Sequence, residues 1–248
     1  MPEATSPAPP PDSDSSKRSG LLTDNPWIPY VAPMFVFLAL TQAEVLLPQT
    51  SDGGPHPTWY PVAYALKVLI VAVVMWICRS AWRDLRPWPN LKGLALSIGI
   101  GLAVIAAWIG LDNRYPPLPF LGGDRQAFDP FVLPMAGAIA FLTVRIIGLV
   151  LLVPVFEELF WRSFLMRWVI DSEFTRVPIG RVTTLAAAVS SIGFALAHPE
   201  WLPALLTGMA WAWLLWKTKS VSACVISHLT ANLALALYVL ITSDWKFW

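Results

Sequence analysis

Apolar stretches of membrane-spanning length recur along this chain, and they constrain its fold more than any other feature. A helix crosses the hydrocarbon core of a bilayer in about 20 residues. Because no water reaches the backbone there, a crossing segment must satisfy its own backbone hydrogen bonds, which favours helices. The apolar stretches cover residues 28–47, 61–78, 91–111, 131–153, 183–197, 201–216 and 221–242.

The composition and charge of the chain exclude several other classes of protein. Of its 248 residues, 56% are hydrophobic and only 13% are charged, about half the charged fraction of a soluble domain. The formal net charge is +1, and no basic run suited to a phosphate backbone occurs, so we expect no nucleic-acid partner. The sequence therefore predicts an all-α, polytopic membrane helix bundle with seven to eight transmembrane helices.

The chain divides into a short polar region and a long apolar one. Residues 1–26 are rich in Pro, Ser, Asp and Ala and have little apolar surface to bury, so we expect a disordered cytoplasmic tail. Residues 27–248 are expected to form one membrane-embedded domain. If residues 131–170 form one long helix that Pro154 bends or breaks, the domain has seven crossings. Eight helical segments, one of them re-entrant, is the alternative.

The distribution of Lys and Arg favours seven crossings with the N-terminus inside, because positive charge flanking a membrane helix is retained on the cytoplasmic side. We therefore expect an integral, multi-pass protein of a bacterial inner membrane or an equivalent one. In this orientation only Arg114, Arg125 and Lys246 lie outside. On the inside lie Lys17, Arg18, Arg79, Arg83, Arg86, Lys92, Arg167, Arg176, Arg181, Lys217 and Lys219.

Three short motifs place polar and ionisable side chains within the apolar region 153–240. A charged side chain in the bilayer core is costly unless it pairs or faces a wet cavity, so such a residue is a candidate functional residue. The motifs are Glu157-Glu158-x-x-x-Arg162, Phe194-x-x-x-His198 and His228-x-x-x-Asn232.

The spacing of the first motif separates its two glutamates. Residues four apart share a helix face, so Glu158 and Arg162 are predicted to form an ion pair. Glu157 is turned away by about 100° and lacks that partner. A desolvated, unpaired carboxyl group is the kind of Glu that can act as a general base or acid near neutral pH. The alternative is that Glu157 belongs to a structural charge cluster.

The two histidine motifs each have a structural interpretation as well. His198 precedes Pro199, where a helix end would offer it unpaired carbonyl groups, and His228 with Asn232 could be an interhelical hydrogen-bonding pair. The depths of Glu157 and these three residues, counted at 1.5 Å per residue from the predicted inner helix ends, fall between roughly 10 and 22 Å. The four side chains can therefore meet in one mid-membrane layer.

In order and spacing, the three motifs resemble those of the CPBP family of intramembrane glutamic endopeptidases, which includes the Ras-converting CAAX endoprotease and bacterial Abi proteins. The resemblance covers residues 153–240. It implies a peptidase without metal or organic cofactor, acting on a membrane-associated protein or peptide that is lipidated or not. Peptide hydrolysis beneath the lipid surface also needs water, and we expect a cytoplasm-facing cavity to supply it.

The resemblance also implies roles for individual residues. Glu157 corresponds to the catalytic glutamate that activates a water molecule, and His198 to the histidine that orients or polarises this water. His228 and Asn232 correspond to the pair that stabilises the oxyanion. The supporting residues are Glu158 and Arg162, which hold the site together, and Phe194, which walls the cavity.

Three alternatives remain at this point. One is a zinc site formed by Glu157, His198 and His228. Another is a noncatalytic membrane scaffold or immunity-type protein that keeps the same framework. The third is a proton-coupled transporter that uses the buried Glu and His residues together with Lys67 and Arg145, although Lys67 could snorkel and Arg145 could pair with Glu157 or Glu158.

Overall fold

A computed structural model describes residues 24–51, 53–121 and 127–247 of the chain. Nearly all of the predicted tail, residues 1–23, lies outside these ranges. Within them the chain is a bundle of helices, and its β-structure is the isolated bridge between Gln49 and Pro55. The α-helices are α2 (Ile28–Ala43), α3 (Trp59–Ile77), α4 (Leu91–Gly110), α5 (Met135–Ile146), α6 (Val153–Glu158), α7 (Met166–Ile170), α8 (Thr184–Leu196), α9 (Trp201–Thr218) and α10 (Val221–Thr242).

Short helical segments link or extend these helices. They are η1 (Glu44–Leu46), η2 (Arg79–Leu85), η3 (Pro119–Leu121), η4 (Pro130–Val132), η5 (Ile147–Leu152), η6 (Leu159–Leu165), η7 (Phe174–Arg176) and η8 (Trp245–Phe247). Of these, η5 and η6 are π-helical.

The predicted all-α membrane class is confirmed. Five helical stretches of the described chain are long and apolar enough to cross a bilayer: Ile28–Leu46, Trp59–Ile77, Leu91–Gly110, Met135–Ile170 and Val221–Thr242. The apolar helix α8 has 13 residues, which at 1.5 Å per residue is about 20 Å and shorter than the hydrocarbon core. The predicted total of seven to eight spans is compatible with this arrangement and stays a prediction.

The region around Pro154 forms one continuous helix of 36 residues from Met135 to Ile170. Proline lacks a backbone N–H and is best tolerated in the first turn of a helix. Pro154 lies in the first turn of α6, directly after the π-helical segment η5. The helix therefore continues through Pro154. Of the two predicted effects of this residue, a bend or a break in one long helix, the break is not found.

Small residues let the helices approach closely. Helix α4 packs against α10 at Gly101, where an added Cβ would collide with the backbone carbonyl oxygen of Ser227. Helix α9 packs against α8 at Gly208, where an added Cβ would lie 2.8 Å from the Cα of Ser191. The small residues at these two positions thus serve helix packing.

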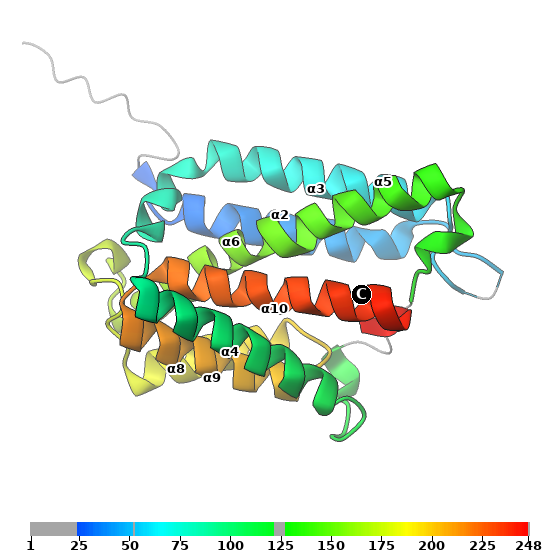
Figure 1. Cartoon of the computed structure of the whole chain (residues 1–248). Helices are drawn as coiled ribbons and strands as arrows, with labels where there is room; N and C mark the ends of the chain where they lie inside the picture. The colour runs from blue at the N-terminus through cyan, green and yellow to red at the C-terminus, as the bar shows by residue number, and fades with distance from the viewer. Residues whose placement is uncertain (1–23, 52, 122–126, 248) are drawn as a thin grey trace, which may run out of the picture.

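The bundle has two chemically different ends (Figure 1). At the left of Figure 1, α2, α4 and α10 begin and α9 ends, and contacts such as Lys219 Nζ to the Gly180 carbonyl (2.7 Å) join the loops of this end. We call it the cationic end because it carries Arg79, Arg83, Arg86, Lys92, Arg167, Arg176, Arg181, Lys217 and Lys219.

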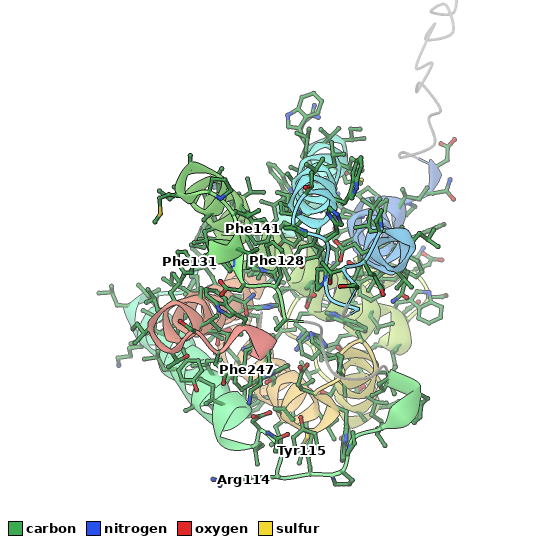
Figure 2. The ribbon with its side chains drawn as sticks, turned by 90° about the vertical axis from the view of Figure 1, so that its right-hand side faces the viewer. Arg114, Tyr115, Phe128, Phe131, Phe141 and Phe247 are labelled. Atoms are coloured by element: carbon green, nitrogen blue, oxygen red, sulfur yellow. The ribbon has the colours of Figure 1, made fainter. Side chains whose placement is uncertain are left out.

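We call the other end the opposite end, and Figure 2 views the molecule from it, with Phe247 near the centre of the view and Arg114 at the lower edge. Side-chain contacts also join its segments. Lys246 Nζ lies 2.6 Å from Asp112 Oδ2, and Trp201 Nε1 donates to the Pro116 carbonyl oxygen at 2.9 Å.

Candidate active site

A cavity of about 480 Å³ in the bundle brings most of the predicted site residues together. Its wall includes Glu157 of α6, His198 after the end of α8, and His228 and Asn232 of α10. Phe194 also lines it, as the family resemblance implied. The convergence expected from the depth estimate is therefore present in the structure, although these residues are up to 75 positions apart in the sequence.

Glu158 and Arg162 lie behind the cavity wall and form the predicted ion pair. Both side chains are fully buried, and Arg162 Nε lies 3.3 Å from Glu158 Oε2. The guanidinium group of Arg162 also lies over two aromatic rings, 5.1 Å from the Phe194 centroid and 5.3 Å from that of Trp211. These contacts compensate charges that are costly to bury alone.

Glu157 is bound very differently from its neighbour. It is 5% exposed. Its Oε2 atom, like Glu158 Oε2, is buried without a hydrogen-bond partner among the described residues, but Glu158 Oε2 has Arg162 Nε beside it at 3.3 Å. A buried carboxyl oxygen without a partner is rare in folded proteins and calls for an explanation such as a water molecule or a catalytic role. Because Glu157 lines the cavity, a water molecule entering there could supply the missing hydrogen bond.

His228 is held from two sides. Its ring stacks on Trp211 with a centroid distance of 4.4 Å, and its Nδ1 lies 3.1 Å from Glu158 Oε1. An ionised carboxylate only accepts hydrogen bonds, so Nδ1 carries the proton in this contact. The neutral ring then has an acceptor at Nε2, and Nε2 becomes a donor only when the ring takes a second proton.

His198 is fixed by the end of α8. Its Nδ1 lies 2.7 Å from the Phe194 carbonyl oxygen, which is the helix-end contact that the structural interpretation predicted. Because a carbonyl oxygen only accepts, Nδ1 again carries the proton, and Nε2 of the neutral ring is an acceptor. His198 thus satisfies the structural interpretation and also lines the cavity.

Asn232 is anchored by an irregularity in the long helix. Its Nδ2 donates to the carbonyl oxygen of Leu149 at 2.7 Å, and Leu149 lies in the π-helical segment η5. The second π-helical segment, η6, accepts a similar bond at the Trp161 carbonyl oxygen from Ser190 Oγ at 3.1 Å. The two irregular segments flank Glu157 and Glu158, and each receives a hydrogen bond from a neighbouring helix. Such π-helical turns are common at functional sites.

Two further cations of the cavity wall have partners that sequence reasoning missed. Lys67 Nζ lies 2.5 Å from Glu44 Oε1, so an ion pair rather than snorkelling accounts for its burial. Arg145 Nη1 donates to the Tyr60 hydroxyl group at 2.8 Å, instead of pairing with Glu157 or Glu158 as the sequence suggested. No sequence signal linked these residues, because their helices meet only in the folded bundle.

The zinc alternative requires Glu157, His198 and His228 to surround one ion. In the part of the chain that the structure describes, no three His, Cys, Asp or Glu side chains are grouped so that they could hold a metal ion. The zinc alternative therefore has no preassembled ligand set among these residues. The expectation of a cofactor-free reaction stays a prediction.

The position of the cavity in the bundle bears on the cytoplasm-facing cavity that the sequence analysis expected. Its wall reaches Glu44, Pro199 and Phe247, which lie at the opposite end of the bundle. The charge distribution assigns the cationic end to the cytoplasm. The expected cytoplasm-facing cavity and the predicted orientation of the chain thus disagree with each other, and both stay predictions.

Comparison with protein families supports the resemblance seen in the sequence. Residues 139–234 match a family model described as type II CAAX prenyl endopeptidase Rce1-like. The matched segment contains all three motifs and both π-helical segments. Neither the curated proteins nor the solved structures gave a match.

Proposed function

We propose that this chain, whose residues 139–234 belong to the Rce1-like family of type II CAAX prenyl endopeptidases, hydrolyses peptide bonds within the membrane by means of a water molecule that Glu157 activates. The family match supports a peptidase, and the apolar helices support an integral membrane protein. The single observation that carries the glutamate mechanism is the buried, unpartnered Oε2 of Glu157 in a cavity shared with two imidazoles.

The reaction follows from the donors and acceptors of the cavity. Glu157 accepts a proton from water, and the resulting hydroxide attacks the carbonyl carbon of the scissile peptide. An imidazole Nε2 acceptor, from His198 or His228, orients the attacking water. As the C–N bond breaks, the proton held by Glu157 passes to the departing amine, so the enzyme returns to its initial state.

The negative charge on the former carbonyl oxygen needs hydrogen-bond donors. Asn232 Nδ2 carries two hydrogens, of which the Leu149 carbonyl oxygen takes one. The other is available to the oxyanion. His228 can donate from Nε2 only after gaining a proton, because its Nδ1 hydrogen is committed to Glu158. The role of oxyanion donor therefore falls first to Asn232.

Glu158 is unsuited to the role of base, and its contacts define a supporting role. Arg162 lies beside one of its oxygens and His228 beside the other. The pair of Glu158 and Arg162 thus holds His228 in position. Helical spacing predicted this difference, in which Glu158 pairs with Arg162 and the adjacent Glu157 does not.

The size of the cavity limits the substrate to a short peptide segment. A volume of about 480 Å³ lies in the range of sites that bind small ligands, so a segment of extended chain can enter where a folded domain cannot. We therefore propose a membrane-associated protein or peptide as substrate, with its cleavage site in an unfolded segment near the membrane.

The experiment compares the membrane-proximal peptides of cells that produce the native protein with those of cells that produce the Glu157→Gln variant. New chain ends that require Glu157 would support the endopeptidase and identify its substrate. Identical peptide sets at equal protein abundance would instead favour the noncatalytic scaffold.

The transporter alternative rests on the ionisable residues that share the cavity wall, from Glu44 and Lys67 to Glu157. A relay has to continue to the other face of the membrane, whereas the cavity wall includes no residue from the last 13 positions of the long helix that ends at Ile170. Proton flux into vesicles that contain the protein, without peptide cleavage, would favour the relay.

A further inference from the structure

The cavity lies in one half of the bundle. Its contributions from α3 are Tyr60, Tyr64 and Lys67, all within the first nine residues of that helix. Its contributions from α4 all come from the last seven residues of that helix, beginning at Val104. Because α3 begins and α4 ends at the opposite end of the bundle, both helices place the cavity there.

The other helices agree with this placement. The cavity wall on α10 starts at His228, the eighth residue of that helix, and the wall on α2 starts at Met34, the seventh. At 1.5 Å per residue, about 9–11 Å of helix separates these positions from the cationic end. The cavity therefore has its floor near Glu157 and His228 and reaches outward to Glu44, Pro199 and Phe247.

The cationic end is closed by a buried polar cluster. The carboxylate of Asp84 accepts hydrogen bonds from the Tyr30 hydroxyl group at 2.8 Å and from Ser163 Oγ at 2.7 Å, and it forms an ion pair with Arg167. These four side chains tie η2, α2, η6 and α7 together. All four are buried, so they seal the bundle between Glu157 and the cationic loops.

The charges at the two ends assign them to sides of the membrane. Among the described residues, the cationic end carries nine Lys and Arg residues, whereas the opposite end carries two, Arg114 and Lys246. Acidic residues are divided almost evenly: the opposite end carries Glu44, Asp112, Asp129, Glu200 and Asp244, and the cationic end carries Asp24, Asp84, Asp171 and Glu173. Positive charge near membrane helices stays in the cytoplasm, so the cationic end is the cytoplasmic one.

We propose that the cavity of Glu157 opens to the non-cytoplasmic side of the membrane, and that its substrate is a peptide segment of an exported or membrane-anchored protein presented from that side. A tail that remains in the cytoplasm would meet the sealed end. That the cavity binds a substrate depends on the proposed function, whereas the direction of the opening depends on helix placement and charge alone.

The direction can be tested by labelling single cysteines with a membrane-impermeant maleimide, which needs no substrate. The background replaces the buried Cys78 and Cys224 by alanine. Ala197→Cys places the probe in the cavity wall beside His198. Arg114→Cys marks the opposite end, and Arg176→Cys, whose native side chain is 74% exposed, marks the cationic end.

In intact cells or right-side-out vesicles, we expect Ala197→Cys and Arg114→Cys to be labelled, and Arg176→Cys to react only after the membrane is permeabilised. The proposal would be overturned if Ala197→Cys behaved like Arg176→Cys and reacted only when the reagent reaches the cytoplasmic side. It would also be overturned by labelling of Arg114→Cys from the cytoplasm, or by failure of Ala197→Cys to react from either side while both reference cysteines react.

A second measurement separates this proposal from the proposed function. If the opening is the route of the substrate, a bulky maleimide attached to Ala197→Cys from outside should lower peptide cleavage at least tenfold, while a label on Arg114→Cys should leave it unchanged. If Ala197→Cys is labelled from outside but no Glu157-dependent cleavage is found, the proposed opening stands and the proposed peptidase function is refuted. Undiminished cleavage after complete labelling of Ala197→Cys would refute the substrate route.

Discussion

The buried pair of Glu158 and Arg162 allows a quantitative prediction. Arg162→Met keeps an unbranched side chain of moderate size among Phe194 and Trp211 but leaves the carboxylate of Glu158 without its cation. Both native side chains are fully buried, so solvent cannot screen the loss. Removing one partner of such a pair costs about 3–5 kcal/mol. For a chain of this size 1 kcal/mol shifts the melting temperature by about 2–4 °C, so we expect a fall of about 6–20 °C.

The double variant Glu158→Gln with Arg162→Met is the matched control. Removing both charges leaves no uncompensated ion in the low-dielectric interior, and paired removal is often close to neutral. We therefore expect the double variant to melt closer to the native protein than Arg162→Met alone does. The assay is thermal unfolding of purified protein in detergent. Losses that simply add in the double variant would refute the ion-pair reasoning.

Three further predictions concern the cavity and the helix packing. Asn232→Ala should lower kcat by about 10²–10³-fold with a smaller effect on KM, because an oxyanion donor acts mainly in the transition state; a change in KM alone would contradict this role. Cleavage by the purified protein should persist in excess chelator, and its loss with recovery on adding zinc would restore the metal alternative. Gly101→Ala should destabilise the protein by about 1–3 kcal/mol, because the new methyl group meets the Ser227 carbonyl oxygen; an unchanged melting temperature would show that the two helices can separate without cost.

Local spacing in the sequence was enough to predict part of the site. The pairing of Glu158 with Arg162 depends only on the four-residue repeat of one helix, and it is present as expected. The same geometry explains why Glu158 has this partner and Glu157, the adjacent residue, does not. Apolar run lengths then placed Glu157, His198 and His228 at similar depths, which helix placement in the cavity bears out.

Features that depend on the rotation and neighbours of whole helices could not be predicted in this way. Asn232 donates to the carbonyl group of Leu149, 83 positions away in the sequence. This carbonyl group lies in a π-helical segment that no residue pattern predicted. Trp211 supports His228, but nothing in the sequence distinguishes it from the other tryptophans among the 14 of the chain. The position of the cavity along the bundle could not be predicted for the same reason, because it depends on which half of each helix lines it.

Peptide cleavage by purified Glu157→Gln protein, compared with native protein and with the double variant Glu158→Gln with Arg162→Met, tests the central claim most directly. The substitution removes the carboxylate and keeps its shape, so we expect the Glu157→Gln protein to melt like the native one and to lose cleavage by several orders of magnitude. The double variant, which retains Glu157, should keep measurable activity. Cleavage by folded Glu157→Gln protein at close to the native rate would contradict the account.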